Sequence, residues 1–270
     1  MTRAVEQAVR EPHLTNVDPY AELPRLYDAE YDALEADGAF FSREAAQGPL
    51  LIVGCGTGRI CRLMEANRST TGLDRSAPML QEARARAAAL SHGAASSDRP
   101  RIAPGGTLYH RADMCDFAVG SFGEVIAPNA AFAFLESQLQ RTQCLLAIHA
   151  ALTPGGSLWI DVPMANYERW EIRHSPEATA WEGEVDGRDV RRTRETFRMP
   201  EQRLLQLVDR YYVGEERIAE SELRLHIASP EELELTVESC GFYVDTIRGG
   251  YSNQPVGPGT PRILLRAVRA

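Results

Sequence analysis

Leu50-Leu51-Ile52-Val53-Gly54-Cys55-Gly56-Thr57-Gly58-Arg59-Ile60 is the stretch from which the fold can be argued. Its first four residues form a short apolar run, which indicates a buried parallel strand. Three glycines follow at alternate positions, and a helical pattern begins at Ile60. Glycine adopts positive φ and leaves the main chain bare, so a ligand can lie against such a turn. The order of strand, glycine turn and helix predicts a nucleotide-type binding site.

A second apolar segment, Thr70–Leu73, ends at an acidic residue, Asp74. In nucleotide-binding βαβ units an acid about 20 residues after the glycine turn binds the ribose hydroxyls. The glycine spacing departs from the dinucleotide fingerprint G-x-G-x-x-G, because Arg59 stands where the third glycine belongs. A nicotinamide dehydrogenase is therefore disfavoured.

The G-x-G-x-G pattern resembles motif I of the class I S-adenosylmethionine-dependent methyltransferases. Three later segments follow in the order that this family shows, at 107–114, 122–132 and 152–161. The last of them contains Pro154-Gly155-Gly156, similar to the family's helix–Pro-Gly-Gly–strand signature. The resemblance covers roughly residues 48–163 and implies an α/β fold and methyl transfer from S-adenosylmethionine.

The expected fold class is α/β. It is a Rossmann-like, doubly wound seven-stranded sheet with an antiparallel last strand and an antiparallel β insertion after strand five. Four segments are expected: 1–47, an N-terminal helical cap with a boundary at Pro24; 48–162, the cofactor-binding core; 163–228, the insertion; and 229–270, a helix and strands that complete the core. The insertion is a candidate substrate lid or surface of a possible homodimer.

Within the insertion, residues 163–187 are expected to be irregular. Strands are expected at 189–199, 203–213 and 221–227, with a turn over 214–217. The basic cluster Arg191-Arg192-x-Arg194 lies in one alternating stretch, so a solvated face is expected there. Residues 91–106 are rich in Gly, Ser and Pro and are expected to form a loop.

The family resemblance implies cofactor contacts at individual residues. The glycine loop would hold the methionine end, Asp74 the ribose, and Asp113 with Met114 the adenine. Met79 would pack on the adenine face, although an ordinary packing role explains it nearly as well. The expected cofactor-binding residues are Gly54, Cys55, Gly56, Gly58, Asp74, Met79, Asp113, Met114 and Asn129.

Methyl transfer from a sulfonium is an in-line displacement, so the protein must mainly align the acceptor and the methyl group. A base is needed only when the acceptor must lose a proton. No metal is expected, because the His, Asp and Glu residues show no compact ligand spacing.

Asp161 ends the expected fifth strand and is a candidate base or orienting group, with capping of the next turn as the alternative. Tyr27 and Tyr31 are the other catalytic candidates, because this region caps the cofactor in related enzymes. Phe134 occupies a position where many relatives have His, which places a His base in doubt and indicates an apolar wall. The expected acceptor-binding residues are Phe132, Phe134, Trp170 and Tyr251.

The net charge of −9 opposes nucleic-acid binding, which needs a basic face. No apolar run reaches about 18 residues, and the start of the sequence lacks an apolar signal core, so neither a membrane span nor a signal peptide is expected. Five cysteines without a C-x-x-C pair indicate reduced thiols and a cytoplasmic location. The sequence contains no lysine, which excludes a lysine Schiff base.

The sequence thus predicts a metal-independent methyltransferase that modifies an N, O or C atom of a small molecule, in natural-product tailoring. The insertion resembles those of amino-sugar N-methyltransferases. The alternative is a protein of the same fold that uses S-adenosylmethionine structurally or catalyses a rearrangement without methyl transfer. A residue able to remove a proton from the acceptor would favour methyl transfer over the alternative, and the sequence does not identify such a residue.

Overall fold

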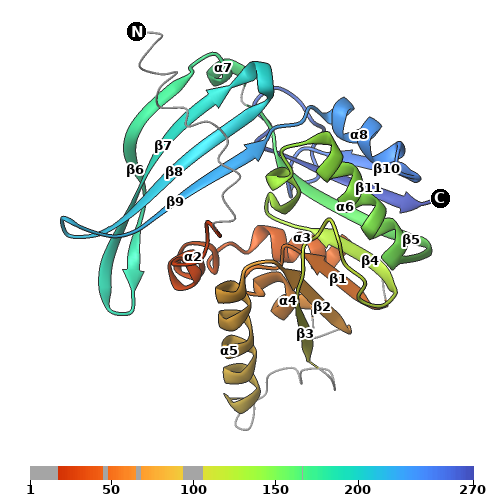
Figure 1. Ribbon diagram of the computed structural model, residues 1–270, viewed down its shortest axis with the longest axis horizontal. Coiled ribbons are helices and arrows are strands. Elements are labelled where there is room, and N and C mark those ends of the chain that lie inside the picture. The colour runs from red at the N-terminus through yellow and green to blue at the C-terminus, as the bar shows by residue number, and fades with distance from the viewer. Residues whose placement is uncertain (1–17, 45–47, 65–67, 94–105, 166) are drawn as a thin grey trace.

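The computed structural model describes residues 18–44, 48–64, 68–93, 106–165 and 167–270, and it contains two β-sheets (Figure 1). The larger sheet has the strand order β10-β11-β5-β4-β1-β2-β3. β11 pairs antiparallel with both neighbours, whereas β1, β2, β3, β4 and β5 pair in parallel. The expected seven-stranded α/β sheet with an antiparallel last strand is confirmed.

The core strands alternate with helices along the chain. The strands are β1 (Leu50–Val53), β2 (Thr70–Asp74), β3 (Thr107–Arg111), β4 (Phe122–Ala127), β5 (Leu152–Pro163), β10 (Phe242–Arg248) and β11 (Arg262–Arg269). The helices are α4 (Arg59–Met64), α5 (Ala77–Gly93), α6 (Gln138–Ala151) and α8 (Pro230–Glu238), with a 3-10 turn η2 (Ala131–Phe134) after β4. Most of the expected 91–106 loop lies outside the described residues.

The two faces of the core sheet pack against different helices. All four residues of β1 are fully buried, which explains why the strand lacks polar alternation. Leu51 and Val53 join the cluster that contains α6 and α8, whereas Leu50 and Ile52 join the cluster of α4 and α5. Successive side chains of a strand point to opposite faces, so this short run builds both layers.

The N-terminal segment forms α2 (Pro24–Tyr31) and α3 (Ala36–Glu44). α2 begins at Pro24, where a missing N–H costs nothing. It contacts both α5 and the second sheet (Figure 1). Residues 1–17 and 45–47 of the expected cap lie outside the described residues, and the division of the chain into four segments stays a prediction.

Two buried carboxylates fasten this N-terminal segment to the glycine loop and to α4. In α3, Asp37 forms a two-pronged ion pair with Arg59 of α4, and both side chains are less than a tenth exposed. In α2, the fully buried Asp28 accepts a hydrogen bond from the hydroxyl of Thr57, within the glycine loop. Burial raises the pKa of Asp28 to about 6, although Thr57 and Arg86 partly offset this rise.

The insertion is a four-stranded antiparallel sheet in the order β6-β7-β8-β9. Its strands are β6 (His174–Val185), β7 (Arg188–Met199), β8 (Leu204–Val213) and β9 (Glu216–His226), with α7 (Tyr167–Trp170) before β6 and η3 (Pro200–Gln202) after β7. The expectation that 163–187 is irregular was wrong, because β6 occupies half of it. β6 is an edge strand, largely exposed and twice interrupted in register, so its sequence lacks clean alternation.

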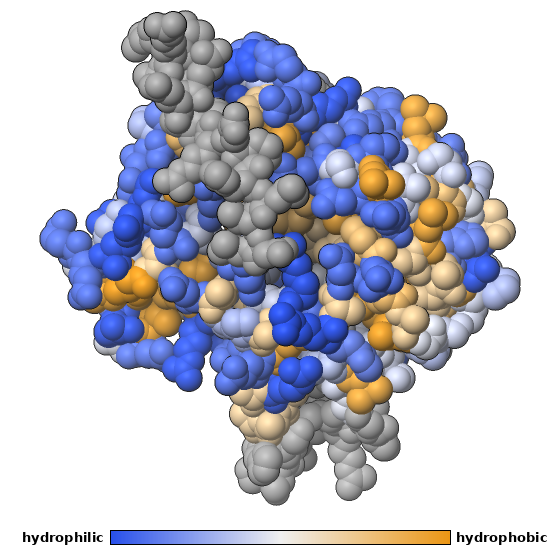
Figure 2. Space-filling view, viewed as in Figure 1, coloured by the Kyte–Doolittle hydropathy of each residue, from blue (hydrophilic) through white to orange (hydrophobic). Residues whose placement is uncertain are grey.

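The turn between β8 and β9 is shorter than expected. Gly214, at φ 57°, and Glu215 form the turn, so β9 begins at Glu216 and not at residue 221. A two-residue turn with positive φ matches the twist of paired strands. Figure 2 shows a largely hydrophilic surface over this sheet on the visible face, with more apolar side chains over the core around α6.

Among the described residues, no helix is both long and apolar enough to cross a membrane.

Replacement of Asp37 by Ala should leave Arg59 charged and unpaired in a buried site. Removal of one partner of a buried ion pair costs about 3–5 kcal/mol, so the free energy of unfolding in urea should fall by that order. Asp186→Asn is the control, because the Asp186–Arg25 pair is more than half exposed on both sides and should matter little, and Asn tolerates the positive φ of this position. Equal losses in the two variants would contradict the interpretation.

Asp28→Asn should change how stability depends on pH. The folded pKa of about 6 lies above the unfolded value of about 3.9, so the folded state binds more protons between these values. The stability of the wild type should therefore fall as pH rises from 4 to 6, whereas the amide in the variant does not titrate. The unfolding free energy of the variant, relative to wild type, should rise by roughly 2 kcal/mol over this window. A difference that is flat, or that falls with pH, would refute the role of Asp28.

Candidate functional site

The glycine loop joins β1 to α4 at the carboxyl edge of the sheet. Gly54, Gly56 and Gly58 all have positive φ, between 54° and 76°. A Cβ atom on Gly54 would lie 2.5 Å from Cβ of Ala131, and one on Gly58 would lie 2.4 Å from the hydroxyl of Tyr109. Both the backbone conformation and the close packing therefore require glycine, and the loop presents main chain to a ligand.

Asp74, at the end of β2, supports this loop. Its Oδ2 accepts a hydrogen bond of 2.8 Å from the Gly56 amide, and its Oδ1 accepts one of 2.9 Å from the Ser76 amide. Burial raises the pKa of Asp74, and these two amides counteract the rise. Each carboxylate oxygen has a second lone pair, so Asp74 can also accept hydrogen bonds from two ligand hydroxyls.

The other expected cofactor residues gather around the same loop. A Cβ atom added to Gly54 would lie 3.8 Å from Cε of Met114, and one added to Gly56 would lie 3.8 Å from Cε of Met79. Asp113, after β3, is exposed, and its carboxylate accepts a 2.8 Å hydrogen bond from the amide of Cys115. Cys55 is buried, and burial raises the pKa of its thiol, so it is a small packing residue and not a nucleophile. The residues present fit an adenosine ligand with a bare-backbone contact at one end.

Asp161, in β5, is fully buried and has three partners. Its Oδ1 accepts a 2.7 Å hydrogen bond from Nε of Arg262. Its Oδ2 accepts one of 2.9 Å from the backbone amide of Asn129 and one of 2.6 Å from the hydroxyl of Tyr251. Asn129 has φ 47°, and its side-chain amide donates to the hydroxyl of Tyr27 at 2.7 Å. Asp161 is thus connected to α2 through Asn129.

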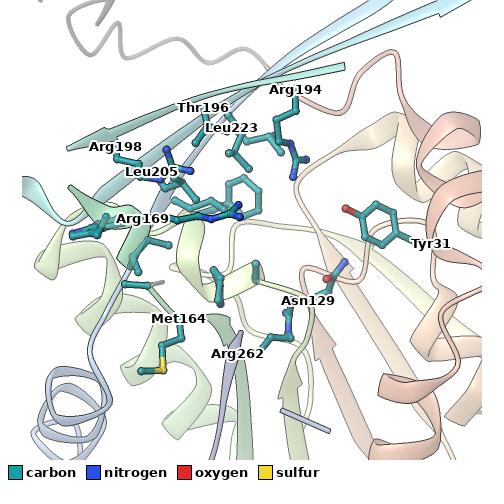
Figure 3. A pocket seen from close by; sticks show the side chains of 18 of the residues that line it. Tyr31, Asn129, Met164, Arg169, Arg194, Thr196, Arg198, Leu205, Leu223 and Arg262 are labelled. Atoms are coloured by element: carbon teal, nitrogen blue, oxygen red, sulfur yellow. The ribbon is translucent and has the colours of Figure 1, made fainter. Parts of the chain in front are cut away.

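A cavity of about 430 Å³ lies next to Asn129, between the core and the concave face of the insertion sheet (Figure 3). Tyr27, Tyr31, Phe134 and Trp170 line it as expected, together with Asn129. The rings of Tyr27 and Tyr31 stack 4.5 Å apart, and burial raises the pKa of both hydroxyls. The N-terminal segment and the insertion therefore both contribute walls to one pocket, which also includes Ala130, the neighbour of the Ala131 that packs against Gly54.

Three expected residues do not line this cavity. Asp161 is hidden behind Asn129 and Arg262. Phe132 is only 2% exposed, because η2 turns it into the core while Phe134 faces the cavity. Tyr251 packs beside Phe40 and Phe41, and its hydroxyl points at Asp161. These three residues act on the pocket only through others.

The structure adds arginines and leucines that the sequence interpretation missed. The cavity is lined by Arg169, Arg194, Arg198 and Arg262 and by Leu205, Leu207, Leu223 and Leu225. The expectation of a solvated face at Arg191-Arg192-x-Arg194 was wrong for two of its members. Arg192 is 5% exposed and pairs with Glu30 and Asp209, and Arg194 faces the cavity. Their even-numbered spacing along β7 is the signal that places them on one face.

Within the described residues, no group of three or more His, Cys, Asp or Glu side chains is arranged to hold a metal ion.

Residues 50–156 match a family model described as a methyltransferase domain. No curated protein matches the chain. Solved structures match over nearly the whole chain, at low sequence identity.

A S-adenosylmethionine-dependent methyltransferase from Clostridium acetobutylicum ATCC 824 is similar with a TM-score of 0.72 and 17% identity, over 93% of this chain and 99% of that one. The chain is also similar to S-adenosylmethionine-bound CalS10, an amino pentose methyltransferase from Micromonospora echinaspora involved in calicheamicin biosynthesis. Here the TM-score is 0.62 and the identity 23%, over 90% of this chain and 91% of that one. The sugar N-methyltransferase KedS8 from Streptoalloteichus sp ATCC 53650 is similar with a TM-score of 0.64 and 20% identity, over 90% of each chain.

The domain match and the shared fold agree with the expected family, since residues 50–156 match a methyltransferase domain and the structural neighbours are S-adenosylmethionine-dependent methyltransferases. The chain has the class I methyltransferase fold, and its residues 50–156 match the methyltransferase domain.

Proposed function

We propose that this protein methylates a nitrogen atom of a small-molecule amine in natural-product tailoring. One observation carries the choice of nitrogen: the described residues that line the cavity include no His, Asp, Glu or Lys. An alcohol must lose a proton in order to react, and a base would be needed nearby. A neutral amine already has a lone pair. The amino pentose and sugar N-methyltransferases among the structural neighbours are consistent with this acceptor class.

The glycine loop and Asp74 are proposed to hold the cofactor. When bound, S-adenosylmethionine would supply an electrophilic methyl carbon for attack by the acceptor nitrogen, with S-adenosylhomocysteine as the leaving group. In this arrangement Asp74 binds the ribose hydroxyls, Asp113 and Met114 border the adenine, and Met79 packs beneath the loop. Gly54, Cys55, Gly56 and Gly58 contact the methionine end. The free lone pairs of Asp74 and the bare glycine backbone support this placement.

Tyr27, Tyr31 and Asn129 are proposed to align the acceptor, with Phe134 and Trp170 as further walls of its site. Tyr27 and Asn129 are hydrogen-bonded to each other, so both are held in place before the acceptor enters. Asp161 is a positioning residue in this proposal, since it touches Asn129 and not the cavity. Arginine charges around the pocket disfavour an ammonium ion, which keeps the acceptor amine in its reactive neutral form. A homodimer, a cytoplasmic location and the absence of nucleic-acid binding stay predictions.

The function is tested by incubating the purified protein with radiolabelled methyl donor and a panel of small amines matched with the corresponding alcohols. Label should pass to amines, with production of S-adenosylhomocysteine. Transfer only to alcohols would overturn the choice of nitrogen. Tight cofactor binding with no transfer to any acceptor would favour a structural use of the cofactor or a rearrangement.

In the same assay, Asp161→Asn should lower kcat by about tenfold, with part of the loss in KM, because a positioning residue acts by alignment. Cofactor affinity should stay unchanged. A direct base would instead cost about 10²–10⁴-fold in kcat, and that result would contradict the positioning role. Tyr27→Phe, which removes the partner of Asn129, should give a loss similar to that of Asp161→Asn.

Asp74→Asn should weaken binding of S-adenosylmethionine, measured by calorimetry. A hydrogen bond to a charged group contributes about 1.5–3 kcal/mol, so each lost contact should cost roughly 10–100-fold in affinity. Asp116→Asn is the control, since its exposed side chain lies in the turn that pairs with Asp113 and has no assigned contact to the cofactor. Unchanged affinity in Asp74→Asn would reject the placement of the ribose.

A further inference from the structure

The cavity lining is strongly positive, although the whole chain carries a net charge of −9. Four arginines line it, and among the described lining residues there is no carboxylate. Arg194 and Arg262 pair with buried carboxylates that do not line the cavity. Arg194 makes hydrogen bonds of 2.6 and 2.7 Å to Asp209, and Arg262 pairs with Asp161.

Arg198 differs from those two. Its guanidinium donates to the carbonyl of Ile172 at 3.0 Å and to the hydroxyl of Ser175 at 2.9 Å, both uncharged. No carboxylate of the described residues lies within ion-pair distance of it. Burial lowers the pKa of Arg198, and the positive charge of Arg169 lowers it further. Arg198 therefore faces the cavity without a carboxylate partner among the described residues, which is unfavourable until an anion binds.

The positions of these two arginines divide the cavity into two ends. In Figure 3, Arg169 reaches into the cavity beside Arg198 and Leu205, whereas Tyr31 and Asn129 lie on the other side. Arg198 is paired with Leu205 across β7 and β8. Leu223 and Leu225, from β9, add apolar surface in between. The site is therefore elongated. Two guanidinium groups lie at one end, apolar side chains line the middle, and the polar residues that align the acceptor lie at the other end.

We propose that Arg169 and Arg198 form an anion subsite, and that the acceptor carries a phosphate or carboxylate group at the end remote from the methylated nitrogen. This inference rests on the proposed function, because it places the reactive end at Tyr27 and Asn129. Planar guanidinium groups bind both oxyanions through paired hydrogen bonds. An anion at this end supplies the charged partner that Arg198 lacks among the described residues, while the amine lies at the opposite end beside Tyr27 and Asn129.

The test is calorimetry on the protein saturated with S-adenosylhomocysteine, titrated separately with inorganic pyrophosphate and with succinate. At least one should bind, more weakly as salt is added. Binding of pyrophosphate alone indicates a phosphorylated acceptor, and binding of succinate alone indicates a carboxylate. Arg198→Gln should weaken the binding by about 10–100-fold, and Arg198→Lys should restore part of it. Arg191→Gln is the matched control, since Arg191 lies on β7 but stacks on Tyr212 outside the cavity.

Failure of both anions to bind, or equal binding to Arg198→Gln and wild type, would overturn the anion subsite while leaving the proposed function intact. If S-adenosylhomocysteine itself fails to bind, the proposed function fails. The same titrations on the protein without it then decide the subsite independently.

Discussion

The buried carboxylate of Asp161 is the constraint on which the acceptor side of the structure depends. A charge with no exposure to water is tolerated only when it is paired and hydrogen-bonded. Asp161 obtains its partners from three places: the turn after β4, the loop before β11, and β11 itself. Satisfying it therefore fixes Asn129 in its left-handed conformation, and Asn129 in turn holds Tyr27.

The N-terminal helix α2 joins the cofactor side to the acceptor side. Asp28 binds the glycine loop, Tyr27 binds Asn129, and Glu30 pairs with Arg192 of the insertion at 2.8 Å. These contacts come from three residues within one helical turn, and the three side chains point in different directions. A shift of α2 would consequently disturb the loop, the pocket floor and the insertion sheet together, which explains why both sides of the site share this helix.

The sequence predicted the parts of the fold that are encoded locally. The buried run of β1, the glycine turn and the acid at the end of β2 predicted the core together with the later segments in family order, because each is a short local pattern. β6 was not predicted, because this edge strand is largely exposed and its sequence does not alternate between apolar and polar residues. The positions of Asp161 and Tyr251 were not predicted either, since whether a carboxylate at a strand end faces the pocket or the core depends on residues some 90 to 100 positions away.

The chemistry of the pocket follows from which charges face it and which do not. Its described ionisable lining consists of arginines and of tyrosines whose pKa burial raises. Arginine stays protonated at every pH that proteins meet, so none of these groups can exchange a proton with an acceptor near neutrality. The described lining can therefore align a nucleophile and bias its protonation, and it supplies no group that removes a proton near neutrality. In the proposed function the acceptor is nucleophilic in its neutral form, and an amine whose ammonium form is disfavoured by fixed positive charge meets that requirement.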